Sequence, residues 1–150
     1  MNRAKLDTVL DIMVHFGKEY QEILAIGLCG SWARGEAHED SDIDLVFVVQ
    51  DQHTFKSTDW IKELDFSQMN DQIAFYKDQE YGRVWSRHVF LKSGIEIEFS
   101  FADESWADIN NLDSGTKKVV SDGYKILYDP TFILDGLVNK VLDIQESHDH

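Results

Sequence analysis

The sequence has one cysteine, one proline and half as many basic side chains as acidic ones. Because Cys29 is alone, an internal disulfide is excluded, and we expect a reducing, cytoplasmic setting. A membrane-spanning helix needs roughly 20 apolar residues in a row. The longest apolar runs, such as Ile43 to Val49, are much shorter, so no membrane span is expected.

The charge is one-sided, since 28 acidic against 14 basic side chains give a formal net charge of −14. Such a chain repels a polyanion, so broad binding to a nucleic-acid backbone is disfavoured. The balance suits a cationic small molecule or a basic protein partner, although acidic groups also simply keep a surface soluble. Apolar residues still make up 43% of the 150 residues, which predicts one folded domain over residues 1–150.

Apolar spacing predicts a mixed α/β chain. The predicted strands are Ile23–Leu28, Ile43–Val49, Val84–Leu91, Ile95–Phe101 and Tyr124–Tyr128. The predicted helices are Arg3–Gln21, a short one opened by Ser31, Thr58–Leu64 capped by Thr58 or Asp59, Ser114–Asp122, and one that begins at Pro130. The turn Lys92-Ser93-Gly94 predicts a hairpin, so we expect a mixed, partly antiparallel sheet with flanking helices.

Gly30 and Ser31 stand where the first predicted strand passes into a short helix. Glycine allows backbone amides to approach a ligand closely. Those amides, the Ser31 hydroxyl and the helix N-terminus would together hold phosphate oxygens. An ordinary capped turn would have the same two residues, so both interpretations stay open for this pair alone.

Asp42 and Asp44 lie two residues apart on the second predicted strand. Their carboxylates therefore point to one side while Ile43, Leu45 and Phe47 face the core. Like charges this close repel, and each raises the pKa of the other. A cation between them relieves that repulsion, and magnesium prefers carboxylate and phosphate oxygens. The pattern predicts a metal site shared with a nucleotide.

The second strand of the hairpin supplies two further carboxylates, Glu96 and Glu98, which alternate with apolar residues and share one face. If this strand lies beside Ile43–Val49, one glutamate reaches the metals and could act as general base toward an acceptor hydroxyl. Two solvated glutamates on an exposed face would give the same pattern. Residue type does not choose between them, and we favour Glu98.

These residues resemble the DNA polymerase β-type nucleotidyltransferase superfamily. Its signature is a Gly-Ser turn, an Asp-x-Asp strand about ten residues later and a carboxylate on a later strand. Gly-Ser-Trp-Ala-Arg-Gly at residues 30–35, followed by Ser-Asp-Ile-Asp-Leu at residues 41–45, is similar to the small stand-alone members. Those include minimal nucleotidyltransferases and the enzymes that modify aminoglycosides and lincosamides.

The resemblance implies transfer of a nucleoside monophosphate from a nucleoside triphosphate to a hydroxyl of a small molecule or protein, with release of pyrophosphate. It implies two magnesium ions bridging the triphosphate and the attacking oxygen. The metal ligands it implies are Asp42, Asp44 and Glu98, with Glu96 competing for the third place. The residues it implies around the nucleotide phosphates are Gly30, Ser31 and Arg34.

A second hypothesis is a non-catalytic, antitoxin-like module that binds a nucleotide without turnover. Because a short chain offers little acceptor-binding surface, a homodimer with the pocket between subunits is a further expectation. No second metal ligand stands at a suitable spacing from either His38 or His88, so both are interpreted as surface or packing residues. The residues interpreted as buried or packing residues are Cys29, Trp60, Trp85 and Trp106.

Overall fold

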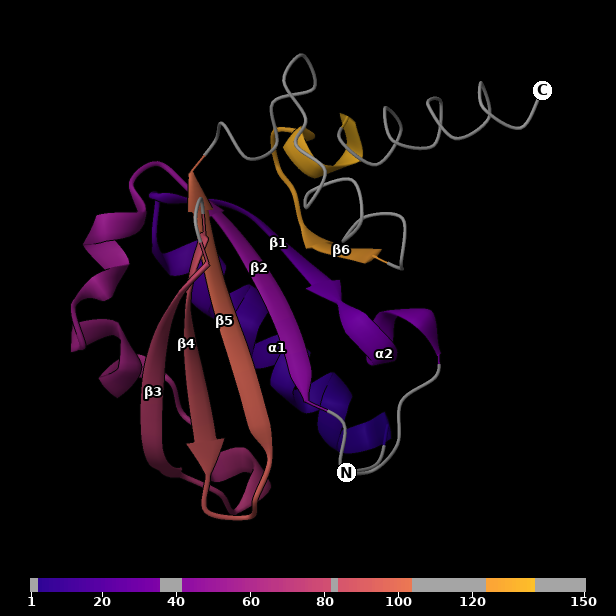
Figure 1. The fold of residues 1–150 in the computed structure, drawn as a ribbon. Coiled ribbons are helices and arrows are strands. Elements are labelled where there is room, and N and C mark those ends of the chain that lie inside the picture. The colour runs from indigo at the N-terminus through magenta and orange to yellow at the C-terminus, as the bar shows by residue number, and fades with distance from the viewer. Residues whose placement is uncertain (1–2, 36–41, 82–83, 104–123, 137–150) are drawn as a thin grey trace.

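The computed structural model describes residues 3–35, 42–81, 84–103 and 124–136, which contain one six-stranded sheet in the order β3-β4-β5-β2-β1-β6 (Figure 1). The strands are β1 (Ile23–Cys29), β2 (Ile43–Val49), β3 (Ile73–Tyr81), β4 (Val84–Leu91), β5 (Glu96–Asp103) and β6 (Tyr124–Tyr128). The helices are α1 (Arg3–Glu19) and α2 (Gly30–Arg34), with 3-10 helices η1 (Gln52–Lys56), η2 (Asp59–Glu63) and η3 (Ser67–Met69). The predicted mixed α/β fold is confirmed.

The sheet is mixed because its central pair, β2 and β5, runs parallel while the other neighbouring strands run antiparallel. β4 and β5 form the predicted hairpin, closed where the Leu91 amide donates to the Ile95 carbonyl at 2.8 Å. The chain enters β5 and β2 from the same end of the sheet, so the first residues of both strands lie together. That end carries the acidic residues singled out by the sequence.

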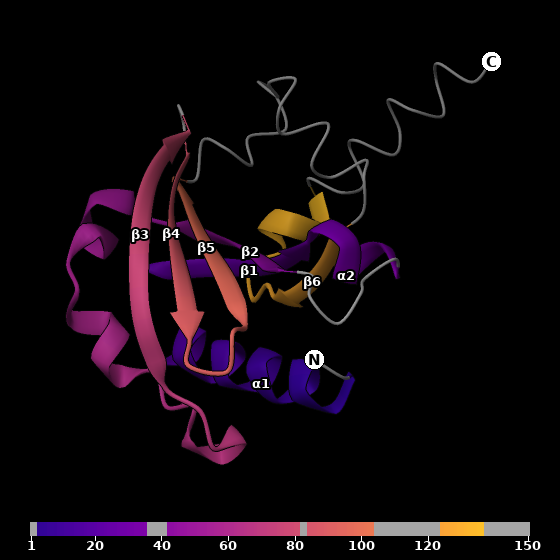
Figure 2. The same ribbon diagram turned by 60° about the horizontal axis from the view of Figure 1, so that its bottom comes forward.

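One face of the sheet is covered by α1, which lies across it in both views (Figures 1 and 2). Alternate residues of β2 point into this face, and Ile43, Leu45 and Phe47 are at most 1% exposed, as predicted. Phe47 stacks on Phe99 and Phe101 with ring centroids 5.6 and 5.2 Å apart. We call this side of the sheet the apolar face.

A buried arginine, Arg87, binds the segment around residues 56–57 to the apolar face. Arg87 is 1% exposed and donates to both carboxylate oxygens of Asp78 on β3, at 2.7 and 2.9 Å. It also donates to the carbonyls of Lys56 and Ser57 at 3.0 and 2.9 Å. Because every contact offsets the loss of hydration, the buried charge can be tolerated, and η1 is held beside β4.

Several elements differ from the sequence expectations. β3 was not predicted, and the predicted helix over residues 58–64 is a 3-10 helix whose N-cap, Thr58, makes no side-chain cap bond. The helix expected at Pro130 begins instead at residue 133. The Asp129 carboxylate accepts from the amides of Leu134 and Asp135 at 3.2 and 2.9 Å and so caps that later start.

Some expectations cannot be compared with this structure. The helix predicted over Ser114–Asp122 and the interpretations of His38 and Trp106 fall outside the described residues. Within the described ranges, no helix is both long enough and apolar enough to cross a membrane.

Candidate functional site

Four carboxylates gather where β2 and β5 begin. In the parallel register Asp44 lies directly opposite Glu98, and Ile43 lies opposite Ile97. Asp42 and Glu96, one position earlier on each strand, share a hydrogen bond. The structure thus brings together Asp42, Asp44, Glu96 and Glu98, which we call the carboxylate cluster. They lie on the side opposite the apolar face, which we call the site face.

Two members of the carboxylate cluster, Asp42 and Asp44, have raised pKa values. Loss of hydration, then the charge of Glu98 and a hydrogen bond to it, raise the pKa of Asp44 from 3.8 to about 7. Loss of hydration, then a hydrogen bond to Glu96 and its charge, raise the pKa of Asp42 from 3.8 to about 6. Burial and the neighbouring acids on β5 therefore make the ionised forms of Asp42 and Asp44 less favourable than in water, and a bound cation would relieve that cost.

The Gly30 turn packs directly against this cluster. β1 ends at Cys29, which lies opposite Asp44, and Gly30 follows with φ +73° as the first residue of α2. A Cβ at Gly30 would overlap Oδ2 of Asp44. Only glycine fits here, because the backbone is left-handed and the carboxylate fills the place of a side chain. The turn expected to hold phosphates thus adjoins the carboxylates expected to hold metals.

The other residues expected around the nucleotide are placed only in part. Ser31 and Arg34 belong to α2, on the chain that leaves β1 at the carboxylate cluster. Their side chains fall outside what the structure describes. The backbone therefore brings both residues to the site, while the roles of the hydroxyl and the guanidinium remain predictions.

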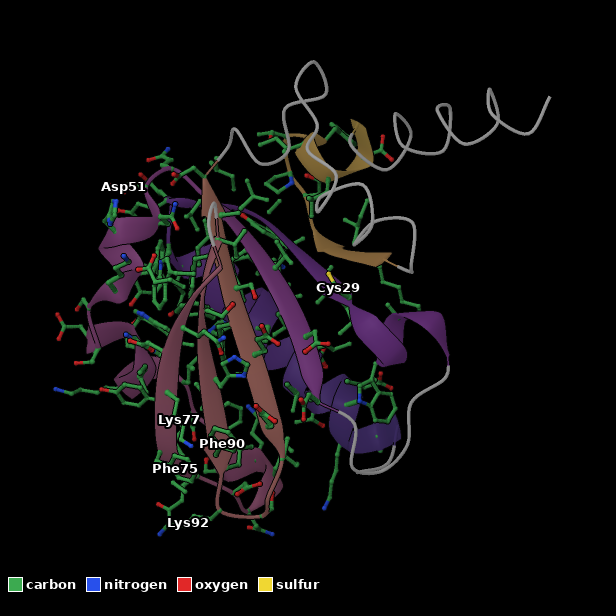
Figure 3. All side chains as sticks on the ribbon, in the orientation of Figure 1. Cys29, Asp51, Phe75, Lys77, Phe90 and Lys92 are labelled. Atoms are coloured by element: carbon green, nitrogen blue, oxygen red, sulfur yellow. The ribbon has the colours of Figure 1, made fainter. Side chains whose placement is uncertain are left out.

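Cys29 borders the cluster but is not suited to be a nucleophile. Its side chain is 7% exposed, and Figure 3 labels it on β1 where that strand approaches α2. Burial, together with the charges of Asp44 and Glu98, raises the pKa of the Cys29 thiol well above its ordinary value. The thiol stays protonated, as expected for a buried packing residue.

His88 is mostly buried, and it lies beside the carboxylate cluster, a position that its interpretation as a surface or packing residue did not anticipate. It stands on β4 directly opposite Glu98. Its Nδ1 contacts Oε1 of Glu96 at 2.9 Å, and its Nε2 is 3.8 Å from Oε1 of Glu98. The signal was present in the hairpin, because a turn at residues 92–94 already pairs residue 90 with 96 and residue 88 with 98.

Two serines continue the polar face beyond Glu98. Ser100 Oγ lies 3.5 Å from Oε1 of Glu98, and the hydroxyls of Ser86 and Ser100 are 2.8 Å apart. On the other side of His88, two residues further along β4, Phe90 stacks on Phe75 of β3 with ring centroids 4.5 Å apart (Figure 3). The carboxylate cluster is therefore bounded by hydroxyls on one side and by an aromatic pair on the other.

The donor set fits a hard divalent cation. Asp42, Asp44 and Glu98 offer carboxylate oxygens, the ligands that magnesium takes together with phosphate oxygens. The pKa values of Asp42 and Asp44 are raised by burial and by the charges of the neighbouring glutamates, and a bound cation would offset both costs. Among the described residues, no three His, Cys, Asp or Glu side chains are already arranged around one point as a bound metal would require. The carboxylates would therefore turn toward the ion as it binds.

Two cavities lined by described residues lie away from the carboxylate cluster. One, of about 320 Å³, lies between α1 and residues 63–68, and the other, of about 590 Å³, is lined by residues 61–73. Neither includes a carboxylate of the cluster or Gly30. The chemistry therefore points to the site face rather than to either cavity.

Comparison with known proteins agrees with this geometry. A family model described as "Polymerase beta, Nucleotidyltransferase" matches residues 13–97, which is more than half of the chain and contains the whole carboxylate cluster except Glu98. The match ends one residue short of Glu98 and includes Glu96. No curated protein matches the sequence.

The chain is similar to several solved structures at low sequence identity. An aminoglycoside 6-adenyltransferase from Bacillus subtilis has a TM-score of 0.50 and 17% identity, covering 66% of this chain and 35% of its own. A toxin-antitoxin complex with AMP-PNP has a TM-score of 0.49 and 13% identity, covering 92% and 87%. A cytoplasmic RNA terminal U-transferase has a TM-score of 0.47 and 17% identity, covering 65% and 28%. This chain spans about a third of the adenyltransferase.

Proposed function

Since the chain belongs to the polymerase beta nucleotidyltransferase family, we propose that it is a magnesium-dependent enzyme that moves a nucleoside monophosphate from a nucleoside triphosphate to a hydroxyl. The acceptor hydroxyl belongs to a small molecule or a protein. The observation that carries the proposal is the pairing of Asp44 with Glu98 across β2 and β5, directly beside the Gly30 turn. Outside such a site, this pairing of like charges would only cost stability.

Asp42, Asp44 and Glu98 would hold two magnesium ions. When bound, the ions would neutralise the charge of the triphosphate and the charge that develops during phosphoryl transfer. The protein's own part is to place three carboxylates on two adjacent strands whose positions the sheet fixes. Because those strands are central in the sheet, the ligands need little reorganisation beyond side-chain rotation.

The turn at Gly30 and Ser31 would bind the β- and γ-phosphates through backbone amides. The left-handed Gly30 turns the chain at the end of β1, next to Asp44. Amides exposed by such a turn attract anions. The leaving pyrophosphate would then lie on the β1 side of the metals, with Arg34 as a further proposed contact from α2.

In-line displacement places the acceptor on the other side of the transferred phosphorus, toward β5 and β4. The acceptor oxygen forms a bond to the α-phosphorus while the bond to pyrophosphate breaks. The proton of the acceptor hydroxyl passes to a nearby carboxylate, for which Glu98 and Glu96 are the available groups. Both lie on β5, as that geometry requires.

The net charge of −14 favours a cationic acceptor over nucleic acid. An aminoglycoside, the substrate class named for the Bacillus subtilis protein, is therefore one class of acceptor to screen, together with basic proteins. Salt dependence would identify an electrostatic contribution, because screening weakens attraction between exposed charges.

Nucleotide binding can be tested by thermal unfolding with each triphosphate, with and without magnesium. A ligand at about 100 times its Kd stabilises the native state by about 2.7 kcal/mol, which raises the Tm of a chain this size by roughly 5–10 °C. We expect that rise only when magnesium is present, and we expect Asp42→Asn/Asp44→Asn to abolish it. Asp11→Asn, an exposed aspartate on α1, is the matched control and keeps the rise.

Binding without transfer would favour the non-catalytic alternative. If wild type binds a triphosphate with magnesium but labels no acceptor in a broad screen, a nucleotide-binding module becomes the better account. If no triphosphate shifts the Tm at millimolar concentration, the proposed enzyme is wrong and only the fold assignment stands.

A further inference from the structure

The two glutamates of β5 have different surroundings. Glu96 lies between Asp42, the residue just before β2, and His88 on β4, and its Oε1 is 2.9 Å from Nδ1 of His88. Glu98 lies opposite Asp44, and its Oε1 has only longer contacts, 3.5 Å to Ser100 Oγ on β5 itself and 3.8 Å to His88 Nε2 on β4. Glu96 is therefore held from β4, and Glu98 is not.

His88 is bound to Glu96 through one of its two ring nitrogens, Nδ1. An ionised carboxylate only accepts, so Nδ1 of His88 is the donor when Glu96 is ionised. The His88 side chain is 18% exposed, and its Nε2 is the one buried side-chain nitrogen or oxygen in the described ranges without a hydrogen-bond partner. The ring thus has a single strong contact, and that contact fixes its position between β4 and β5.

Moving Glu96 to a metal would break this contact. A hydrogen bond to an ionised carboxylate contributes more than a neutral one, and losing it would leave Nδ1 of a mostly buried ring unpaired. Glu98 can turn toward Asp44 without breaking a hydrogen bond of comparable length. The free-energy difference favours Glu98 as the carboxylate that moves.

We propose that His88 is a positioning residue that holds Glu96 on the β4 side and so reserves the third metal-ligand place for Glu98. The inference rests on the proposed metal-dependent function, and it assigns distinct roles to two glutamates that the sequence cannot separate. It also explains why a histidine stands opposite Glu98 on the site face. His88 acts through Glu96 and does not itself touch the nucleotide.

The test measures Mn²⁺ affinity in the presence of a non-hydrolysable triphosphate analogue, by electron paramagnetic resonance of free Mn²⁺. Mn²⁺ takes the same oxygen ligands as magnesium. We expect Glu98→Gln to weaken binding by about tenfold or more, and Glu96→Gln to weaken it by less than about threefold. An equal or larger loss with Glu96→Gln would overturn the proposal.

A second comparison tests whether His88 is what keeps Glu96 from binding the metal. In the Glu98→Gln background, His88→Ala releases Glu96, which can then replace the missing ligand and recover at least about threefold in affinity. His88→Asn keeps an amide nitrogen where Nδ1 stands, so it retains the hydrogen bond and gives no recovery. Equal affinities for the two double variants would contradict a positioning role.

Two controls separate failure of this inference from failure of the function. His15→Ala, on the exposed surface of α1, should leave Mn²⁺ affinity unchanged. Wild type must bind Mn²⁺ with the analogue, and Asp44→Asn must not. If wild type fails to bind, the proposed function and this inference fall together. If wild type binds and the His88 pattern is absent, only the inference falls. Melting curves confirm that each variant is folded.

Discussion

The two faces of the sheet are built from alternate residues of the same strands, yet they differ in almost every physical respect. On β2, Ile43, Leu45 and Phe47 are buried under α1, whereas Asp42 and Asp44 keep contact with solvent and with other acids. The apolar face gains free energy from every contact that it makes. The site face retains an unfavourable grouping of charge that the charge of His88, which lowers the pKa of Asp42, offsets only in part.

This difference shows how one short strand can contribute to the core with one set of residues and to the candidate site with the other. Because side chains alternate, β2 fixes the core with one set of residues and aims the carboxylates with the other. A substitution on the apolar face should therefore change stability and leave ligand affinity per folded molecule unchanged. A substitution on the site face should chiefly change ligand affinity and should change stability less than a substitution on the apolar face.

The largest expected effect is on the apolar face. Phe47→Ala removes a fully buried ring that stacks on Phe99 and Phe101, so the free energy of unfolding should fall by roughly 3–5 kcal/mol. Urea unfolding measures the loss, and Mn²⁺ affinity per folded molecule should stay within about twofold. If Phe47→Ala does not fold, Phe47→Leu gives the same test with a smaller loss. A large fall in affinity for folded Phe47→Leu would show that the two faces are coupled.

A smaller effect is expected where the faces meet the Gly30 turn. Gly30 and Gly35 have nearly the same φ, +73° and +74°, so alanine at either position should cost about 1–2 kcal/mol of backbone strain. A Cβ at Gly30 would also overlap Asp44, whereas no atom of the described residues lies within 4 Å of a Cβ at Gly35. Gly30→Ala should therefore weaken magnesium-dependent nucleotide binding by about tenfold more than Gly35→Ala does.

Gly35→Ala is thus the matched control for backbone strain. Isothermal titration measures nucleotide affinity for both variants, and thermal unfolding measures their stability. Equal affinities would mean that the contact between Gly30 and Asp44 has no part in binding.

The smallest expected effect is a gain of stability on the site face. The pKa of Asp44 is about 7 in the folded chain against an ordinary value of 3.8, so between those pH values the folded state keeps a proton that the unfolded state releases. The free energy of unfolding therefore falls as pH rises through this window. Asp44→Asn removes the effect and should be more stable than wild type at pH 8, by about 1–2 kcal/mol because solvent screens a partly exposed group.

Thermal unfolding at pH 3 and pH 8 checks this prediction. The advantage of Asp44→Asn should vanish near pH 3, below the ordinary pKa of 3.8, where the carboxyl is mostly protonated in both states, and it should shrink at pH 8 when magnesium is added to wild type. A variant that is less stable than wild type at pH 8 would mean that the carboxylate cluster is not under repulsion.

Much of the fold could be predicted from the sequence, because the spacing of apolar residues along a strand or helix indicates which side chains are buried. The strand over Ile43–Val49 and the last strand, Tyr124–Tyr128, have the predicted bounds. β3 escaped prediction because it is the outer strand in the described sheet order and is mostly exposed on both faces. An exposed strand carries little hydrophobic alternation, so only its pairing with β4 reveals it.

The residues of the candidate site could also be predicted from the sequence, except where the position of a side chain depends on how two strands are paired. Asp42, Asp44, Glu96 and Glu98 stood out by type and spacing, and the pairing of β2 with β5 brings them together. His88 escaped notice because no ligand stands near it along the chain. The 3-10 helix at Asp59–Glu63 could not be told from an α-helix, since Trp60, Ile61 and Leu64 are buried in either.

The measurement that tests the central claim most directly is a crystal structure with magnesium and a non-hydrolysable triphosphate analogue. The account predicts metal density between β2 and β5, ligated by Asp42, Asp44 and Glu98, with the β- and γ-phosphates at the Gly30 turn and Glu96 still bonded to His88. A nucleotide bound elsewhere, such as the cavity beside α1, or bound without metal at the carboxylate cluster, would contradict it.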